Sequence, residues 1–365
     1  MNNIFFTTAS SKTINLLRLP LAILVVILHC NARFSNLDSN TIELGIYNFI
    51  RTIFSNALCH IAVPTFFFIS GYLFFLTRGG GFLKEYKRKL IKRFYTLIIP
   101  YFIWNVIYIV LSIVIKYKLD YKHFFEEYGY IWELFYNSCS WGDVMQPLTG
   151  PFLYPLWFIR DLIILSIISP IIYILTKKLR IFYVTILFII YILFLWPNIP
   201  GLSMNAIFFF SAGAYLAIEK KDIVTECKKL KNIGMSCFII LLVFIIYMNI
   251  SHNSVPKNIF AIYLITSVIS VINIGSYLTN KNIEIKKEFS DMSFFIYCIH
   301  HVFLIGLSIK ISHKLSFLFF SNNNLIYLSQ LILTPLIVLS FCYIFYKVIK
   351  YLSPMTLNIL NGNRL

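Results

Sequence analysis

LLRLPLAILVVILHC, residues 16–30, is an apolar run with only two ionisable side chains, Arg18 and His29. Similar runs recur along the whole 365-residue chain, in which 59% of the residues are hydrophobic and 13% are charged. Soluble domains are roughly 45–50% apolar and about 25% charged, so this composition fits a protein that lies in lipid. The sequence therefore predicts an all-α fold, a polytopic integral membrane helical bundle.

The apolar runs predict about ten transmembrane helices, each long enough to cross most or all of a bilayer. Their approximate ranges are 14–32, 55–77, 97–115, 156–176, 181–196, 204–218, 235–250, 258–279, 291–310 and 326–348. The first run has no small-residue cleavage site after it, so no cleavable signal peptide is expected. We expect a single membrane domain over residues 1–350, followed by a short cytoplasmic tail over residues 351–365.

The net charge of +17 is distributed as in a membrane protein and does not predict a nucleic-acid partner. Lys and Arg gather in alternate short loops, at 78–96, 177–180, 219–233 and 280–290. Such an excess marks the cytoplasmic side, where it also faces anionic lipid headgroups. Both termini are therefore predicted to be cytoplasmic. The aromatic-rich segment 116–155 is predicted to form an outer interfacial helix or lid.

Arg18 and His29 are functional candidates because ionisable side chains inside a membrane span are costly. They are eleven residues apart, which is close to three turns, so one helix face carries both, roughly 16 Å apart along the axis. A cation at one end of a face and a titratable base deeper in the membrane suit a substrate channel. The alternative is that Arg18 extends to the interface while His29 bonds a neighbouring helix.

A dense cationic cluster precedes the third span, and it contains Arg88, Lys89, Lys92 and Arg93. It could hold phosphate groups by charge and by bidentate hydrogen bonds. It could equally serve only as a topology signal, which every membrane protein needs. The residues alone do not decide between these two interpretations.

Other polar positions occur in later spans. His300 lies within the ninth span and is a second candidate for the channel, whereas His301 would point about 100° away on an α-helix. Adjacent Arg160 and Asp161 are expected to have different partners, because neighbouring residues do not face each other on a helix. In the second span, Ser70-Gly71 is expected to permit a close helix approach.

Motifs typical of other enzyme classes are missing from the sequence. It contains no GxSxG, no HExxH and no glycine-rich phosphate loop set between a strand and a helix. The 7 Cys residues have no CxxC spacing, and most lie in or beside apolar runs. The sequence therefore predicts neither a disulfide framework nor a metal site.

Six segments, taken in order, resemble the acyltransferase 3 family of bacterial and animal membrane proteins. They are Arg18–His29, Val63–Leu73, Arg93–Tyr101, Leu156–Leu162, Phe208–Tyr215 and Ser293–His300. Each segment alone is weak evidence for the resemblance, but the ordered set is specific to the family and spans nearly the whole chain. One departure concerns the third-span motif, which often has two spaced basic residues before its Ile-Pro-Tyr. Tyr95 stands where one of them is expected, so Lys89 or Lys92 would supply that cation.

The resemblance implies a ten-helix enzyme of a bacterial plasma membrane, in the stand-alone form without a fused esterase-like domain. Such an enzyme takes an acyl group, usually acetyl from acetyl-CoA, and passes it to a hydroxyl of a polysaccharide or lipid-linked glycan. The family's functional Arg and His map onto Arg18 and His29, and its basic third-helix start maps onto Lys89 to Arg93.

We therefore predict an O-acetyltransferase in which Arg88, Lys89, Lys92 and Arg93 hold the phosphates of acetyl-CoA. His29 would act as general base or as transient acyl carrier, with Arg18 and His300 as further catalytic candidates. The predicted partners are membrane lipid, acyl-CoA and a glycan acceptor. A transporter or flippase for a glycan or small amphiphile is the alternative; inverted repeats would favour it, and no convincing halves are seen.

Overall fold

The computed structural model describes residues 6–32, 45–77, 81–119, 150–197 and 199–364, and within them every regular element is helical. Eight of the described helical segments are long and apolar enough to cross a membrane. Two shorter apolar helices, Ile181–Ile192 and Met204–Ile218, occupy the predicted fifth and sixth spans. The prediction of an all-α, multi-pass membrane bundle is therefore confirmed. Most of the predicted outer loop, at 120–149, lies outside the described residues.

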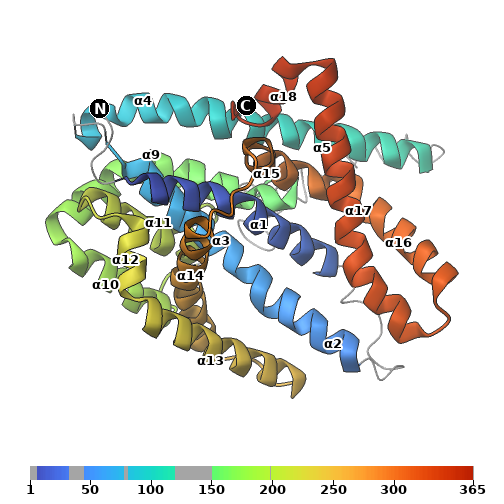
Figure 1. The fold of residues 1–365 in the computed structure, drawn as a ribbon. Helices are drawn as coiled ribbons and strands as arrows, with labels where there is room; N and C mark the ends of the chain where they lie inside the picture. The colour runs from blue at the N-terminus through green and yellow to red at the C-terminus, as the bar shows by residue number, and fades with distance from the viewer. Residues whose placement is uncertain (1–5, 33–44, 78–80, 120–149, 198, 365) are drawn as a thin grey trace.

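The described chain forms a series of helices, several of which follow one another directly or after a short turn (Figure 1). In order, they are α1 (Thr8–Ala32), α2 (Gly45–Arg51), η2 (Thr52–Ala57), η3 (Leu58–Ile61), α3 (Ala62–Phe75), α4 (Phe82–Arg93), η4 (Phe94–Ile98), α5 (Ile99–Leu119), η6 (Tyr154–Leu156), α9 (Trp157–Leu179), α10 (Ile181–Ile192), α11 (Met204–Ile218), α12 (Ile223–Lys229), α13 (Lys231–Ile250), α14 (Lys257–Asn280), α15 (Lys287–Ile299), η7 (His300–Leu304), α16 (Ile305–Phe319), α17 (Asn323–Leu352) and α18 (Pro354–Leu360). Three of these elements, η2, η4 and η7, are π-helical, a rare geometry that occurs frequently at functional sites.

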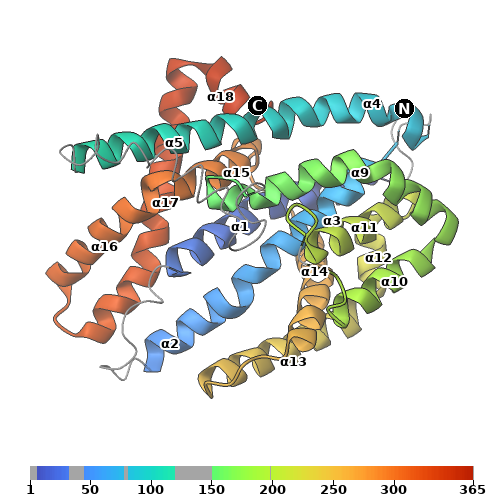
Figure 2. The ribbon, with the colours of Figure 1, turned by 180° about the vertical axis from the view of Figure 1, so that it is seen from behind.

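The basic segment before the third span is helical, and the prediction of a loop over residues 78–96 is wrong for its described part. Helix α4 continues through η4 into α5, and Figures 1 and 2 show them as one long rod along the edge of the bundle. The reason is local, because Leu, Lys, Glu and Arg are good helix formers and dominate α4. The cations therefore project from a fixed scaffold.

Helices α3 and α11 approach each other closely in the interior of the bundle. A Cβ atom at Gly71 would lie 2.0 Å from the Phe210 carbonyl oxygen, and one at Gly213 would lie 2.0 Å from that of Phe68. Only a residue without a side chain fits at either position, so the backbones can touch. This confirms the prediction that Ser70-Gly71 permits a close helix approach, and it fixes the side of α3 that faces the site.

The segment 353–364, for which the sequence predicts only a short tail, folds back beside α5 in both ribbon views (Figures 1 and 2). Leu357 of α18 is fully buried. The indole nitrogen of Trp104 on α5 donates to the Leu360 carbonyl oxygen at 3.1 Å, and the Asn361 amide donates to the Asp291 carbonyl oxygen at 3.0 Å. The segment is thus attached to two spans.

Candidate active site

A cavity of about 750 Å³ lies between α1, α3, α4, α9, α15 and the segment 353–364. Its lining includes one acidic side chain, Glu85, and six cationic side chains: Arg18, Arg88, Lys89, Lys92, Arg93 and Arg364. The cavity therefore brings together Arg18 and all four residues predicted to bind the donor. Cavities of this size accommodate cofactor-sized ligands, and the excess positive charge favours an anionic one.

Contacts with α3 hold the deeper cations of α4 in place. The Arg93 guanidinium donates from Nη2 to the Ser70 hydroxyl at 3.0 Å and lies over the Phe74 ring, 5.2 Å from its centroid. The Lys89 ammonium donates to the carbonyl oxygens of Phe74 and Leu76, at the last turn of α3. Such carbonyls lack partners within their own helix and attract cations. Ser70, which sequence reasoning assigned to packing, thus also orients a cavity cation.

The exposed cations of α4 are arranged differently. Arg88 pairs with Glu85 one turn earlier on the same helix, at 2.7 Å, with 63% of the Arg88 side chain exposed. Lys92 is also exposed. The cationic lining is therefore graded: Arg88 and Lys92 lie toward solvent, while Lys89 and Arg93 are half-buried.

His29, His300 and His301 form a cluster of three imidazoles where the end of α1 meets η7. The His29 ring centroid lies 5.2 Å from that of His300 and 5.3 Å from that of His301. The Tyr154 ring stands edge-on to His29 at 6.2 Å. The two histidines predicted to be catalytic are thus neighbours, although 271 residues separate them along the chain.

His300 is fully buried, and its two ring nitrogens differ. Nδ1 lies 3.1 Å from the Ile296 carbonyl oxygen, whereas Nε2 is buried with no hydrogen-bond partner among the described residues. A carbonyl only accepts, so the contact assigns the proton to Nδ1 and leaves the Nε2 lone pair free in the neutral ring. An unsatisfied buried nitrogen beside His29 is costly for a purely structural residue.

His301 is placed differently from its predicted position. The expected α-helical rotation would have turned it away from the channel, but its ring contacts both His29 and His300. The reason is the π-helical geometry of η7, in which each turn holds more residues than an α-helical turn. The prediction that His301 lies apart from the other two histidines is therefore wrong.

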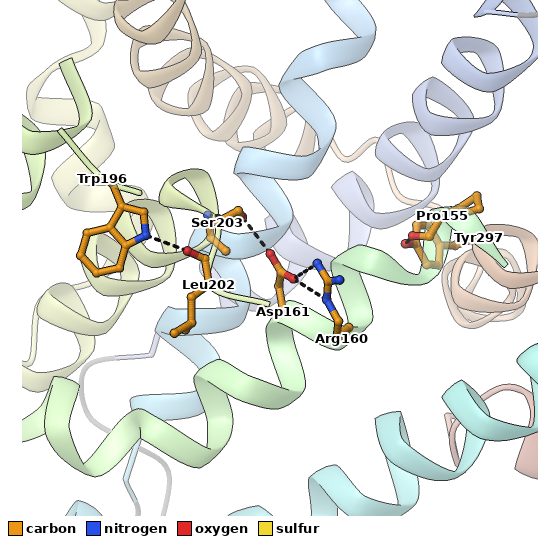
Figure 3. Close-up of polar contacts among 8 residues, drawn as sticks. Pro155, Arg160, Asp161, Trp196, Leu202, Ser203 and Tyr297 are labelled. Carbon is orange, nitrogen blue, oxygen red and sulfur yellow. Dashed lines mark hydrogen bonds and ion pairs between the residues drawn. The ribbon is translucent and has the colours of Figure 1, made fainter. Parts of the chain in front are cut away.

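Tyr297 connects the cationic cavity to the histidine cluster. Its ring lines the cavity and lies 6.1 Å from the His300 ring. Its hydroxyl donates to the Pro155 carbonyl oxygen, which joins α15 to the start of α9 (Figure 3). Arg18 lines the same cavity as Tyr297, so Arg18 and His29 both face the continuous helix α15–η7, as their spacing predicts.

A second charged group lies on α9, where Arg160 and Asp161 bond to each other (Figure 3). Arg160 donates to Asp161 Oδ1 from Nε at 3.1 Å and from Nη2 at 2.9 Å. Ser203, at the start of α11, donates to Asp161 Oδ2 at 2.8 Å. The expectation that these neighbours have different partners is wrong for the ion pair, because the long Arg160 side chain bends back to the adjacent carboxylate.

Sequence reasoning missed two cavity residues, Tyr297 and Arg364. Tyr297 lies inside the segment Ser293–His300, but a Tyr in an apolar span carries no distinct signal. Arg364 follows the last span and becomes part of the cavity only through the fold of α18.

Comparisons with known proteins identify the family of the chain. A family profile described as an acyltransferase domain matches residues 11–348. The succinoglycan biosynthesis protein ExoH of Rhizobium meliloti (strain 1021) is 24% identical over 368 aligned positions, which cover 97% of this chain and 92% of that protein. No solved structure matches the chain.

Proposed function

Because the chain belongs to the acyltransferase 3 family, we propose that this membrane acyltransferase moves acetyl from acetyl-CoA to a glycan hydroxyl. The acceptor is a cell-surface polysaccharide or its lipid-linked precursor, in a bacterial plasma membrane. The name of the similar succinoglycan biosynthesis protein supports a glycan acceptor. The family assignment favours group transfer over the alternative of a transporter or flippase.

One observation carries the choice of donor. The 750 Å³ cavity is lined by six cations and one acid, and Tyr297 joins it to the histidine cluster. Acetyl-CoA has three phosphate groups at one end and a thioester at the other. Charge-assisted hydrogen bonds to the phosphates would hold the first end, and the pantetheine arm would place the thioester toward His29.

The histidine cluster would supply the chemistry of transfer. As a general base, His29 would take the proton of the acceptor hydroxyl while its oxygen attacks the thioester carbonyl, and coenzyme A would leave as the thiolate. As an acyl carrier, His29 would attack the thioester carbonyl and take the acetyl group while coenzyme A leaves as the thiolate; the acceptor hydroxyl would then attack this acetyl group, releasing the imidazole and a proton that neutralises the thiolate. In both routes His300, with its free Nε2, lies close enough to orient His29 or the substrate.

The position of the cavity supports a proposal for the orientation of the protein in the membrane. The cationic cavity opens beside α4, and Figures 1 and 2 place the start of α4 at the same end of the molecule as the described N-terminus and the α9–α10 turn. Positive charge favours the cytoplasmic side, which is where acetyl-CoA is made available. We therefore propose that both termini are cytoplasmic. Reporter fusions near residues 85, 225 and 285 should report cytoplasm.

The proposed function is tested by mass spectrometry of surface glycans from cells with and without the gene. We expect loss of an acetyl-sized mass increment in the deletion strain and its return when the gene is restored. Glycans that keep all acetyl groups but fail to reach the surface would instead support transport.

A further inference from the structure

Arg364 reaches the cationic cavity because the segment 353–364 is held against the spans. Besides the bonds made by Trp104 and Asn361, the backbone turns at Gly362 with a positive φ of 65°. A Cβ at Gly362 would lie 2.4 Å from the Thr96 carbonyl oxygen, so only glycine permits this approach to η4. Arg364, two residues later, lines the cavity.

The Arg364 guanidinium is fixed in position but not saturated. Its Cζ atom lies 3.6 Å from the centroid of the Phe294 ring of α15, and Nη1 donates to the Asn361 carbonyl oxygen at 2.9 Å. A guanidinium has five N–H donors, and among the described residues no second acceptor and no carboxylate pairs with it. The remaining N–H donors are available to a ligand. The contact with the Phe294 ring already fixes the position of the guanidinium group that carries them.

Arg364 is one of three guanidinium groups that meet in the inner part of the cavity. Burial lowers the pKa of Arg364 to about 9, and the charges of Arg93 and Arg18 act in the same direction. The group still carries its proton at neutral pH. Asp291 lies within electrostatic range of Arg18 and offsets part of this charge. Three half-buried guanidinium groups with so little compensation are stabilised by a bound anion.

The order of the phosphate groups along the donor matches the order of the cavity cations from exposed to half-buried. In an acyl-CoA, the ribose 3′-phosphate lies at the far end, the diphosphate comes next, and the pantetheine arm leads to the thioester. In the cavity, Arg88 and Lys92 are exposed and Arg364 is half-buried beside Phe294, which is on the same helix as Tyr297. The diphosphate therefore falls at the inner cations when the arm points toward the histidines.

We propose that Arg364, with Arg18 and Arg93, binds the diphosphate of the acyl donor, while Arg88 and Lys92 bind its 3′-phosphate. This proposal rests on the acetyl-CoA donor proposed above. It makes the segment 353–364 part of the donor site. Arg364 is thus a binding residue and takes no part in proton or acyl transfer.

Calorimetric titration of the full chain in lipid nanodiscs tests the proposal. Three ligands are compared: coenzyme A, dephospho-coenzyme A, which lacks the 3′-phosphate, and pantetheine, which lacks all phosphates. We expect Arg364→Ala to weaken the first two by the same factor, at least about tenfold, and to leave pantetheine unchanged. Arg364→Lys should recover part of the loss, because an ammonium keeps the charge without the planar fork.

Matched variants separate a phosphate contact from a packing effect. The double variant Arg88→Ala/Lys92→Ala should weaken coenzyme A but not dephospho-coenzyme A. Met355→Ala, 77% exposed on α18, and Lys178→Ala, an exposed cation outside the cavity, should bind all three ligands as the wild type does. Equal loss in Met355→Ala would overturn the proposal, since the segment and not the guanidinium would then matter.

Three possible results distinguish this inference from the proposed function. If the wild type binds coenzyme A and Arg364→Ala binds both phosphorylated ligands equally well, the role of Arg364 is refuted and the proposed donor stands. A loss confined to coenzyme A would likewise refute the diphosphate assignment. If the wild type binds neither phosphorylated ligand, the proposed donor fails, and this inference fails with it.

Discussion

Two regions among the described residues of the bundle contain charged side chains, and they differ in how their charge is balanced. On α9, the carboxylate of Asp161 is fully buried, and it accepts from Arg160 and Ser203. In the cavity beside α4, six cations face a single acidic side chain. In the first region, groups of the protein itself balance the negative charge of the carboxylate. In the second region, the excess of positive charge and the N–H donors that carry it can be matched by a ligand.

The comparison separates structural charge from functional charge in a membrane protein. A buried carboxylate that accepts from a cation and from a hydroxyl of another helix holds elements together, here the start of α11 against α9. Cations without matching acids repel one another in the empty site, which raises its free energy. The same cations attract a bound anion, which lowers the free energy of the occupied site. Both regions are equally conspicuous in the sequence, so the distinction rests on which partners the fold provides.

The largest expected effect concerns the balanced region. Asp161→Ala should destabilise the protein by about 3–5 kcal/mol, because it removes the buried carboxylate that accepts from both Arg160 and Ser203. The measurement is the apparent melting temperature in detergent together with the yield of folded protein. Any folded fraction should keep the wild-type KM for acetyl-CoA. Normal stability with a raised KM would place Asp161 in the donor site. The difference between the α9 region and the cationic cavity would then be refuted.

The cavity should behave in the opposite way. Lys92→Ala/Arg93→Ala should raise the apparent KM for acetyl-CoA at least tenfold, since each charge-assisted hydrogen bond contributes about 1.5–3 kcal/mol. The melting temperature should stay near that of the wild type, because removing like charges relieves repulsion. Steady-state kinetics in nanodiscs provide the KM, with Lys178→Ala as the control. An unchanged KM in a well-inserted double variant would leave these cations as a topology signal.

The smallest effect is expected at an exposed pair that belongs to neither region. Lys12 and Glu284 are 2.6 Å apart, but 55% and 56% of their side chains are exposed. Exposed pairs contribute about 0–1 kcal/mol because water and salt screen them. Lys12→Ala should therefore change neither the melting temperature nor the KM. A clear loss of stability would contradict this expectation, because it would show that an exposed ion pair can stabilise this protein.

The sequence predicted the architecture well because lipid imposes strong rules on it. Runs of apolar residues, alternating basic loops and the need for internal hydrogen bonds predict helices and their order. The Arg18–His29 face and the cationic cluster were also predictable, since charge inside or beside a span is rare. These signals are local, and each can be read from one segment.

The three features that the sequence did not predict have different physical causes. Arg364 becomes a cavity residue only because Gly362 lets the chain approach Thr96. His301 joins His29 because η7 is π-helical, and no propensity in His300–Leu304 indicates that geometry. Arg160 and Asp161 pair because the long Arg160 side chain bends back to the adjacent carboxylate, although neighbouring residues point in different directions on a helix. Tertiary packing thus places Arg364, local backbone geometry places His301, and side-chain conformation pairs Arg160 with Asp161.

The most direct test of the account is the activity of His29→Gln. Glutamine keeps a donor and an acceptor for packing, but it cannot take the proton or carry the acetyl group. The account predicts that glycan acetylation, measured by mass spectrometry at matched protein levels, falls by about 10²–10⁴-fold while binding of coenzyme A is unchanged. His313→Gln, an exposed position on α16, serves as the control, because His301 contacts His29. Near-normal acetylation in His29→Gln would contradict the mechanism.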